Sequence, residues 1–311
     1  MEGTLCSIVI PVYNEEDNIS ELYRRLTNVL SSISMEYEII FVNDGSRDKS
    51  LEKIKDISVT DRKIYYISFT RNFGHEAAST AGLDAAGGDC VILMDADLQD
   101  PPELIPQMLD LWHKGYHLIY AKRRKRHGES LFKKITANIF YRGLNLLSDS
   151  KIPMDTGDFR LMDRAVVDDF KKCREQNRFI RGLTAWVGYD HVAIEFDRPE
   201  RHAGKTKYNP FKLFLLSLDV IIGFSIIPLR IATIMGFMVV LLSLVIISII
   251  VVQKFFLNLS IPGYALLVSG LFFLGGVQMF FLGVIGEYIG KIYRQVQQRP
   301  LYLIKEQNIP K

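Results

Sequence analysis

Three side chains that carry oxygen ligands follow an apolar run near residue 90. The run Val91 to Met94 is typical of a buried strand, and two prolines end it before a helical pattern begins at Glu103. Directly after the run come Asp95, Asp97 and Gln99. On extended backbone alternate side chains share a face, so these three would offer oxygen atoms to one hard cation, Mg²⁺ or Mn²⁺. A polar turn after a core strand is the competing interpretation, because Asp-x-Asp by itself is a common pattern.

The first hundred residues alternate strand and helix patterns. Apolar strand patterns cover 5–12, 37–42, 63–69 and 90–94, and helical patterns lie between them. One is a small-residue helix over 76–86 that could pack closely on a sheet, and another has an apolar face at helical spacing, formed by Ile19, Leu22, Leu26, Leu30 and Ile33. This alternation predicts an α/β fold with parallel strands and right-handed crossovers. Ligands of such sheets bind beyond the carboxyl ends of the strands. We therefore expect one site at that edge.

Polar clusters follow each of the four predicted strands. They are Tyr13 to Glu15, Asp44, Arg71 to Gly74, and Asp95 to Gln99. Asp44 alone would be read as a turn residue, but at a strand end it becomes a candidate acceptor for hydrogen bonds from a nucleobase or ribose. No Gly-x-Gly-x-x-Gly follows the first strand and the chain has no Walker-type loop, so a dinucleotide cofactor and ATP hydrolysis are unsupported.

The second half of the chain is markedly apolar. Of 311 residues 48% are hydrophobic, and two uncharged runs, 231–252 and 264–286, lie close together. Each exceeds the roughly 20 residues that cross a hydrocarbon core, so they predict a transmembrane hairpin rather than buried core helices. Lys and Arg precede the first run and follow the second, which predicts that both ends of the hairpin lie in the cytoplasm.

Composition indicates the compartment and excludes one class of partner. The three cysteines show no metal-ligand spacing and fit a reducing compartment, and no signal peptide is expected. A net charge of +3 does not indicate nucleic-acid binding.

The predicted organisation has four parts. Residues 1–207 form a cytoplasmic α/β domain, 208–230 a juxtamembrane helix region, 231–287 the hairpin and 288–311 a cytoplasmic tail. The mixed polarity of 208–230 favours a helix lying at the bilayer interface. A linker helix packed on the first domain is the alternative for this region.

Five ordered motifs resemble the inverting glycosyltransferases of family two. They are Ile10-Pro11-Val12-Tyr13-Asn14-Glu15, Val42-Asn43-Asp44-Gly45-Ser46, Arg71-Asn72-Phe73-Gly74, Asp95-Ala96-Asp97-Leu98-Gln99-Asp100-Pro101-Pro102-Glu103 and Thr156-Gly157-Asp158-Phe159-Arg160-Leu161. Within that family they resemble the polyisoprenyl-phosphate, dolichol-phosphate mannose synthase-like branch, and bactoprenol glucosyltransferases most of all. The resemblance implies a GT-A type nucleotide-sugar domain with a mostly parallel sheet, followed by interfacial helices and a two-helix transmembrane hairpin.

The resemblance also implies roles for the motif residues. Those that hold the nucleoside would be Pro11, Tyr13, Glu15 and Asp44. Those that bind the diphosphate and its metal would be Asp95, Ala96, Asp97 and Gln99, with Asp97 and Gln99 as the direct metal ligands. The family often has lysine where this chain has His75, so a phosphate contact is not expected there.

A basic run between residues 122 and 134 is the predicted acceptor side. A solvated face or a membrane-surface patch is the ordinary interpretation of such a run. A phosphate nucleophile, however, must approach a diphosphate of the same sign, which requires cations between the two. The family pattern places Arg123 first and Lys133 second in that role, and Arg201, Lys205 and Lys207 could reach a lipid phosphate.

Asp158 is the predicted acid near the reacting centre. By sequence alone it could cap a helix starting near Met162 or pair with Arg160. The resemblance assigns this position as catalytic base. A phosphate monoester has its second pKa near ~6 and needs little deprotonation, so we expect Asp158 to position groups, with base catalysis as the variant. Asp155 lies outside the motif and ranks lower.

The expected reaction is inverting hexosyl transfer from UDP-glucose to polyprenyl (undecaprenyl) phosphate. Its expected partners are the nucleotide sugar, the lipid phosphate, the inner cell membrane, further copies of the chain (a tetramer, by resemblance) and a separate flippase. A processive polysaccharide synthase is one alternative, but no Gln-x-x-Arg-Trp segment is present and two spans are few for a polymer channel. A non-catalytic membrane protein that binds nucleotide sugars is the other.

Overall fold

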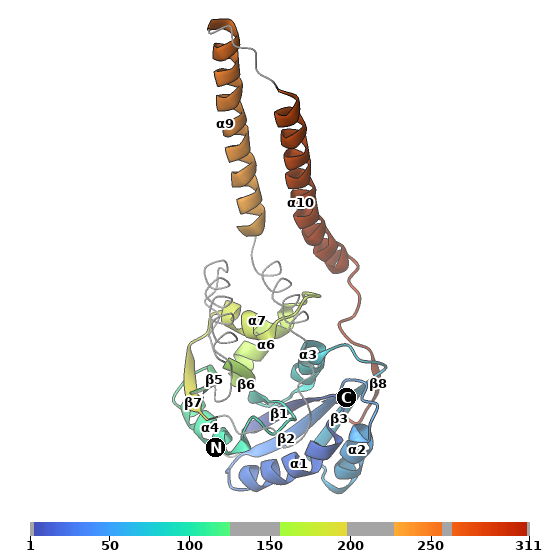
Figure 1. Ribbon diagram of the computed structural model, residues 1–311. Coiled ribbons are helices and arrows are strands. Elements are labelled where there is room, and N and C mark those ends of the chain that lie inside the picture. The colour runs from blue at the N-terminus through green and yellow to red at the C-terminus, as the bar shows by residue number, and fades with distance from the viewer. Residues whose placement is uncertain (1–2, 125–155, 198–226, 257–262, 310–311) are drawn as a thin grey trace.

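One mixed sheet is the frame of the catalytic part of the chain. The computed structural model describes residues 3–124, 156–197, 227–256 and 263–309. Its eight strands lie in the order β7-β5-β6-β4-β1-β2-β3-β8, with helices on both faces and a long helical pair projecting from one end (Figure 1). The predicted α/β class is therefore confirmed.

The strands of the first half pair in parallel, and those of the second half add antiparallel neighbours. Their bounds are β1 Leu5–Val12, β2 Glu36–Asn43, β3 Ile64–Phe69, β4 Cys90–Leu93, β5 Leu118–Arg123, β6 Thr156–Asp163, β7 His191–Phe196 and β8 Ile304–Gln307. The pairs β1–β2, β1–β4, β2–β3 and β5–β7 are parallel, whereas β4–β6, β5–β6 and β3–β8 are antiparallel. Four of these strands are the ones the sequence predicted.

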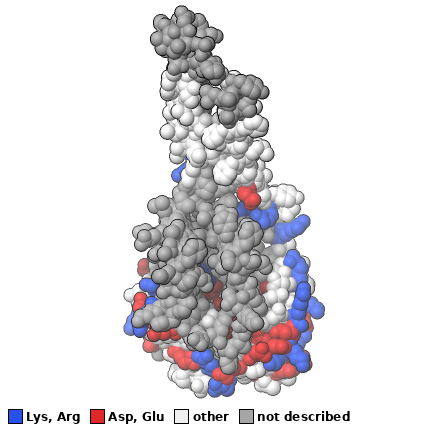
Figure 2. All heavy atoms as spheres, viewed as in Figure 1, with Lys and Arg blue, Asp and Glu red and all other residues white. Residues whose placement is uncertain are grey.

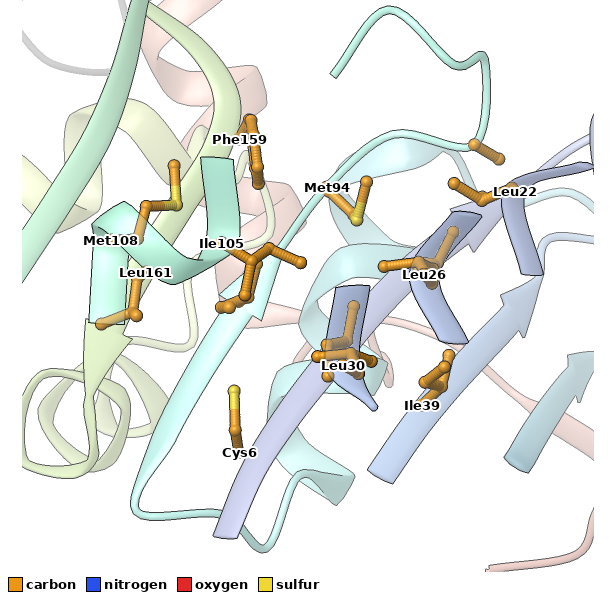
Figure 3. Close-up of a cluster of buried hydrophobic side chains, with 14 of the residues drawn as sticks. Cys6, Leu22, Leu26, Leu30, Ile39, Met94, Ile105, Met108, Phe159 and Leu161 are labelled. Atoms are coloured by element: carbon orange, nitrogen blue, oxygen red, sulfur yellow. The ribbon is translucent and has the colours of Figure 1, made fainter. Parts of the chain in front are cut away.

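The helices of the catalytic part cover both faces of the sheet. They are α1 Glu16–Leu30, α2 Ser50–Thr60, α3 His75–Ala85, the short 3-10 helix η1 Pro102–Leu104, α4 Ile105–His113, α6 Arg164–Lys172 and α7 Ile180–Val187. On α1 the apolar stripe of Ile19, Leu22, Leu26 and Leu30 is fully buried, as the helical spacing predicted. It meets Ile39 and Met94 of the sheet side in one apolar cluster (Figure 3).

The small residues of α3 allow this helix to lie close against the sheet. A Cβ atom at Gly82 would come within 2.1 Å of Val9 Cγ1 and 3.2 Å of Val42 Cγ2. Val9 and Val42 lie on β1 and β2, the two strands that α3 crosses. The predicted close packing of this helix is confirmed, and it brings the first turn of α3 to the carboxyl edge of the sheet.

One local prediction was wrong, and one strand was not foreseen. Residues 156–163 form strand β6 rather than the start of a helix near Met162, and Asp163, not Asp158, caps the following helix by accepting from Ala165 N at 2.9 Å. The tail, predicted only as a cytoplasmic segment, contains β8, which pairs with β3 at the edge of the sheet. Both strands depend on partners far away in sequence, which a local pattern does not reveal.

The two apolar runs form the long helices α9 Ile227–Phe256 and α10 Tyr264–Val296. Segments long and apolar enough to span a membrane cover Leu229–Ile246 and Gly270–Val296, and none of either segment is buried within the chain. Large side chains such as Phe237, Phe272 and Phe280 are well exposed. Exposed apolar surface on this scale needs lipid or protein around it. The interfacial helix predicted over 208–230 lies almost wholly outside the described residues.

Candidate active site

The direction of β6 places Asp158 at the carboxyl edge of the sheet. Leu93, the last residue of β4, pairs with Arg160 of the antiparallel β6. Asp158, two residues earlier on β6, therefore extends beyond the end of β4, where Asp95 begins the next loop. The register Val9 with Leu93 and Val12 with Asn43 brings the ends of β1 and β2 to the same edge. The predicted convergence at strand ends is thus present, and β6 adds to it from the opposite direction.

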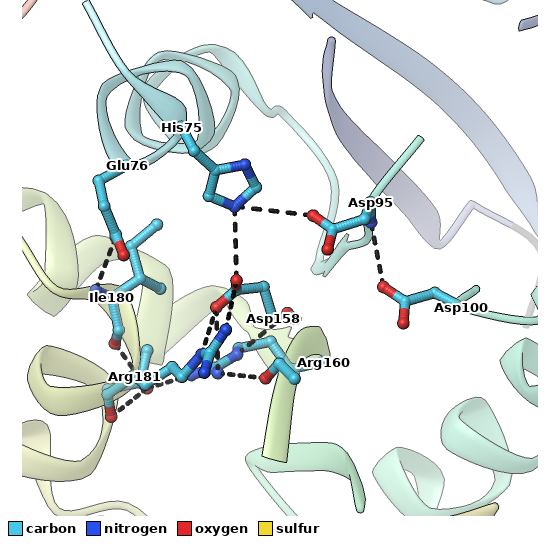
Figure 4. Close-up of polar contacts among 10 residues, drawn as sticks. His75, Glu76, Asp95, Asp100, Asp158, Arg160, Ile180 and Arg181 are labelled. Atoms are coloured by element: carbon cyan, nitrogen blue, oxygen red, sulfur yellow. Dashed lines mark hydrogen bonds and ion pairs between the residues drawn. The ribbon is translucent and has the colours of Figure 1, made fainter. Parts of the chain in front are cut away.

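A bridge of charged groups joins the β4 loop to β6 (Figure 4). His75, at the first position of α3, places Nε2 3.6 Å from Asp95 Oδ1 and 3.4 Å from Asp158 Oδ2. Arg181 of α7 donates from Nε and Nη2 to the two carboxylate oxygens of Asp158, each at 2.8 Å. A two-pronged guanidinium–carboxylate pair of this kind fixes the orientation as well as the charge of both partners.

The environment sets the charge of each group in this bridge. Burial would raise the pKa of Asp158, but the charge and hydrogen bonds of Arg181, together with His75, hold it well below its usual range. Burial would likewise lower the pKa of His75, but the hydrogen bond with Asp158 and the charge of Asp95 raise it to about 10. Burial raises the pKa of Asp95, which His75 partly offsets. At neutral pH, Asp158 is therefore an anion between two cations.

Two further buried groups hold this bridge in place. Arg160 donates to the backbone oxygens of Gly157 at 3.0 Å and Asp158 at 3.2 Å, and to Thr184 Oγ1 at 2.5 Å. Glu76 accepts from the backbone N–H of Ile180, the first residue of α7, at 2.9 Å. Strand β6 and helices α3 and α7 are therefore fastened to one another around Asp158. The predicted pairing of Asp158 with Arg160 is present only as a long contact of 3.9 Å.

The loop after β4 differs from the extended segment that was predicted. The strand ends at Leu93, residues 96–97 form a turn, and Leu98 has a φ of 61°. Asp95 N donates to Asp100 Oδ2 and Gln99 N donates to Asp97 Oδ1, both at 3.1 Å. The loop is therefore held by its own carboxylates, and the strand alternation that was to align the three oxygen-bearing side chains is absent.

The donor set at this edge suits a divalent cation. Asp95, Asp97 and Gln99 supply oxygen atoms from one short loop, the ligand type that Mg²⁺ and Mn²⁺ prefer. His75, Asp95 and Asp158 form a second candidate group, with ligand atoms all within 4.8 Å of one another. Asp158 in that group is already compensated by Arg181, and His75 offers nitrogen, so the β4 loop fits a hard cation better. Asp95 belongs to both groups.

The predicted nucleoside residues lie on two loops that brace each other. Pro11 is buried in β1, and Tyr13 and Glu15 follow that strand. The amide N–H of Glu15 donates to Ser50 Oγ at 2.9 Å, and Glu15 Oε2 accepts from Asn18 Nδ2 at 2.7 Å. The loop is thus shaped before any ligand arrives.

Asp44, which follows β2, holds the 72–74 turn through hydrogen bonds. Its carboxylate accepts from Phe73 N at 2.6 Å, Gly74 N at 3.0 Å and Asn72 Nδ2 at 2.9 Å, and the side chain is almost fully buried. Asp44 therefore shapes the turn that leads into His75. Whether it also binds a nucleoside, as the resemblance implies, stays a prediction.

Asp44→Ala is expected to lower the free energy of unfolding by about 2 kcal/mol, because it leaves partly buried backbone N–H groups of the 73–74 turn without an acceptor. Urea denaturation measures the change. Asp56→Ala removes an exposed carboxylate from α2 and is the matched control, expected to lie within about 0.5 kcal/mol of the parent. Equal stabilities of the two variants would show that Asp44 does not hold the turn.

The predicted acceptor residues are only partly described. Arg123 is the last residue of β5, one position after Lys122, which pairs with Thr156 two residues from Asp158. The backbone of Arg123 is thus near the site, while the position of its side chain is outside the described part of the chain. Lys133, Asp155, Arg201, Lys205 and Lys207 also lie outside the described residues.

Sequence reasoning missed Arg181 and the bridging position of His75. Neither belongs to a motif with recognisable spacing, and Arg181 is reached only through α7. The single available signal was His75 at the place where related chains often carry lysine. The protonated His75 is also a cation, as lysine would be, but it contacts the carboxylates of Asp95 and Asp158.

Comparisons with known proteins identify the family of the chain. The model of glycosyl transferase family 2 matches residues 7–170, and that of the GtrB C-terminal hairpin matches residues 227–292. An uncharacterized glycosyltransferase of Synechocystis is 49% identical over 96% of this chain and 94% of its own length. The bactoprenol glucosyl transferase derived from a prophage of Shigella flexneri is 42% identical over 96% of this chain and 97% of its own, and the prophage homolog of Escherichia coli K12 is also 42% identical.

Fold and site define a sheet-based transferase whose acidic loop and charged bridge lie at the carboxyl ends of the strands. The chain belongs to glycosyltransferase family 2 and carries the GtrB-type C-terminal hairpin. It is accordingly a glycosyltransferase with a GT-A type domain and an apolar helical pair.

Proposed function

We propose that the protein transfers glucose from UDP-glucose to a polyprenyl phosphate, with inversion at the anomeric carbon, giving polyprenyl-phosphate glucose and UDP. The main support is one arrangement: an acidic loop after β4 faces an ionised, cation-bound Asp158 in a chain that ends in two apolar helices. The relatives named bactoprenol glucosyl transferases match over nearly the whole chain, hairpin included.

In the proposed reaction an oxygen of the lipid phosphate attacks the anomeric carbon as the bond to the β-phosphate oxygen of UDP breaks. The lipid phosphate is already largely ionised at neutral pH, so no strong base is needed. Asp158, with its depressed pKa, is a weak base. Its role is to hold Arg181 and His75 at the point where the two phosphate groups meet. The fixed cations then orient the acceptor and reduce repulsion between the two anions.

The leaving diphosphate would lie against the β4 loop. Asp97 and Gln99, with Asp95 beside them, would hold Mg²⁺ or Mn²⁺ there, and a bound cation would neutralise charge that develops on the departing UDP. His75 keeps the Asp95 carboxylate at the end of the loop nearest to Asp158. The nucleoside would occupy the braced loops after β1 and β2.

The membrane partners follow from the hairpin. We propose that α9 and α10 span the cell membrane with the catalytic part on the cytoplasmic side, where both UDP-sugar and the phosphate end of the lipid are available. Self-association through the membrane helices and a separate flippase stay predictions. In the described chain no atom lies within 4 Å of a Cβ position at Gly275, Gly276 or Gly283, which leaves room for a neighbouring helix.

A panel of UDP- and GDP-sugars tests the donor. Purified full-length protein is supplied with a short prenyl phosphate and Mn²⁺, and mass spectrometry identifies the glycolipid. We expect one hexose per lipid with UDP-glucose, and NMR of the product should show inverted configuration. A polymer would favour the processive alternative. Binding of donor without turnover would favour the non-catalytic one.

Arg123→Ala is expected to raise KM for the prenyl phosphate at least about tenfold with little change in UDP affinity, because it removes a charge-assisted contact of ~1.5–3 kcal/mol to the acceptor. Arg24→Ala, which removes an exposed arginine paired with Glu21 on α1, is the control. Unchanged KM for the lipid would place the acceptor phosphate elsewhere.

A further inference from the structure

A cavity of about 530 Å³ lies at the foot of α10, outside the site described above. One wall comes from the catalytic part, namely Asp84, Arg174 and Gln176. The other wall comes from the end of α10 and the segment that follows it, Gln295 and residues 298–302. The lining is mostly apolar in area, but it also presents guanidinium, amide and phenol groups that can bind a polar ligand.

Hydrogen bonds between the two walls hold the cavity open at a defined width. The backbone N–H of Gln176 donates to Gln295 Oε1 at 2.9 Å, and Gln176 Nε2 donates to the backbone oxygen of Arg299 at 2.6 Å. Tyr302 donates to Asp84 Oδ2 at 2.9 Å and stacks on Phe69 with ring centroids 5.1 Å apart. The cavity is therefore a built feature of the junction between α10 and the sheet.

Positive charge exceeds negative charge at this junction. The lining carries Arg174 and Arg299 but only one carboxylate, Asp84. Arg174 neutralises that carboxylate through two hydrogen bonds of 2.8 and 3.0 Å. Figure 2 likewise shows Lys and Arg gathered where the helical pair meets the catalytic part. No carboxylate in the described part of the chain forms an ion pair with Arg299, so its charge is available to a ligand there.

A third guanidinium lies behind the wall without enough acceptors. Arg178 is close enough to Asp84 and Arg174 for their charges to act on it, and it stacks over the ring of Phe170. Its Nε and Nη2 atoms are buried and have no hydrogen-bond partner among the residues that the structure describes. Buried donors of this kind are costly unless an acceptor or water reaches them. Arg178, on which the charge of Glu175 also acts, does not line the cavity, and its guanidinium adds positive charge near this junction.

The cavity is separate from the transferase site. His75 begins α3 and Asp84 lies near its other end, nine residues later, which corresponds to about 13 Å along the helix axis. A phosphate at Asp84 could not attack a sugar held near Asp95. The cavity also adjoins the end of the apolar segment Gly270–Val296, the level at which lipid phosphates lie if α10 spans a bilayer.

We propose that this cavity binds a phosphate group, with Arg299 as its principal exposed contact, and that the bound phosphate fastens α10 to the catalytic part. The ligand would be the headgroup phosphate of a membrane lipid or a small soluble phosphate. Arginine suits both because its planar fork matches phosphate oxygens.

Full-length protein tests the proposal with two probes. Nanodiscs containing phosphatidylglycerol supply the lipid phosphate, and native mass spectrometry counts the lipid retained after release. Glycerol 3-phosphate, titrated calorimetrically in detergent, supplies the soluble phosphate. Arg299→Gln is expected to weaken binding of one probe at least about tenfold, the effect of one charge-assisted contact. Arg294→Gln, the same change on the last turn of α10 but outside the lining, is the matched control, expected to bind like the parent.

The outcomes separate the two sources and the two sites. Loss confined to phosphatidylglycerol identifies a lipid ligand, and loss confined to glycerol 3-phosphate a soluble one. The proposal would be overturned if Arg299→Gln bound both probes as tightly as the parent does. It would also be overturned if Arg299→Gln and Arg294→Gln weakened binding equally, because that result indicates only a diffuse basic surface. UDP binding, measured in parallel, should be unchanged in both variants, so failure here is distinguishable from failure of the proposed transferase reaction.

Discussion

Asp158→Asn is expected to reduce kcat at least about 100-fold, the effect that small misplacement of catalytic groups produces. The amide keeps the shape of the carboxylate but not its charge, so Arg181 loses a two-pronged partner and His75 loses one of the two anions that it bridges. The two partly exposed cations would then repel each other and reorient. Steady-state kinetics with UDP-glucose and a short prenyl phosphate measures the loss.

Asp163→Asn is the matched control for this variant. Asp163 lies on the same strand, accepts from Trp112 Nε1 at 2.8 Å and caps α6, but within the described residues it forms no hydrogen bond or ion pair with the charged bridge. Asparagine caps a helix about as well as aspartate, so this variant keeps the cap and weakens only the hydrogen bond from Trp112, which should cost about 1 kcal/mol and leave kcat near the parental value. If Asp158→Asn retained parental kcat, the bridge would not be part of the active site. Equal loss of kcat in both variants would indicate a general effect on β6.

Asp97→Ala is expected to weaken Mn²⁺-dependent binding of UDP by at least about 10–100-fold, a range that even outer-shell changes around a metal produce. The substitution removes a carboxylate oxygen and also the acceptor for Gln99 N, so the loop loses a ligand and a hydrogen bond together. Calorimetric titration of UDP with and without Mn²⁺ separates the metal-dependent part. Binding without metal should change much less.

Asp110→Ala is the control for the loss of one acidic charge, because Asp110 is exposed on α4 and belongs to neither candidate ligand group. Gln99→Ala should resemble Asp97→Ala. If both loop variants kept metal-dependent affinity and His75→Ala lost it, the cation would belong to the group of His75, Asp95 and Asp158 instead. The predicted assignment of the direct ligands would then be wrong.

Local sequence was sufficient for the elements that bury an apolar face by themselves. The helical stripe of α1, the small residues of α3 and the apolar strands β1 to β4 were readable because each follows a period of 3.6 or an unbroken apolar run. The apolar pair α9 and α10 was readable for the same reason. Strands β5, β6, β7 and β8 were not predicted, because their stability comes from pairing with distant strands.

The residues of the candidate site also fall into a group that the sequence could identify and a group that only the structure revealed. Motif residues at the ends of β1, β2 and β4 could be named from sequence, because parallel strands bring their carboxyl ends to one edge. Arg181 and the role of His75 could not, because a contact between side chains on α3, β6 and α7 depends on how three elements pack. The geometry of Asp97 and Gln99 was also misjudged, since a positive φ at Leu98 replaces the expected extended backbone.

By itself the sequence determined the class of fold, the apolar hairpin and the acidic loop after β4, because these follow from periodicity, length and residue type. Only the tertiary structure decided that the Asp158 carboxylate is shared between Arg181 and His75, that Asp44 shapes the turn before α3, and that the tail closes the sheet as β8. Those features arise where elements distant in the chain are brought into contact, and the energy of such contacts is not carried by any local pattern.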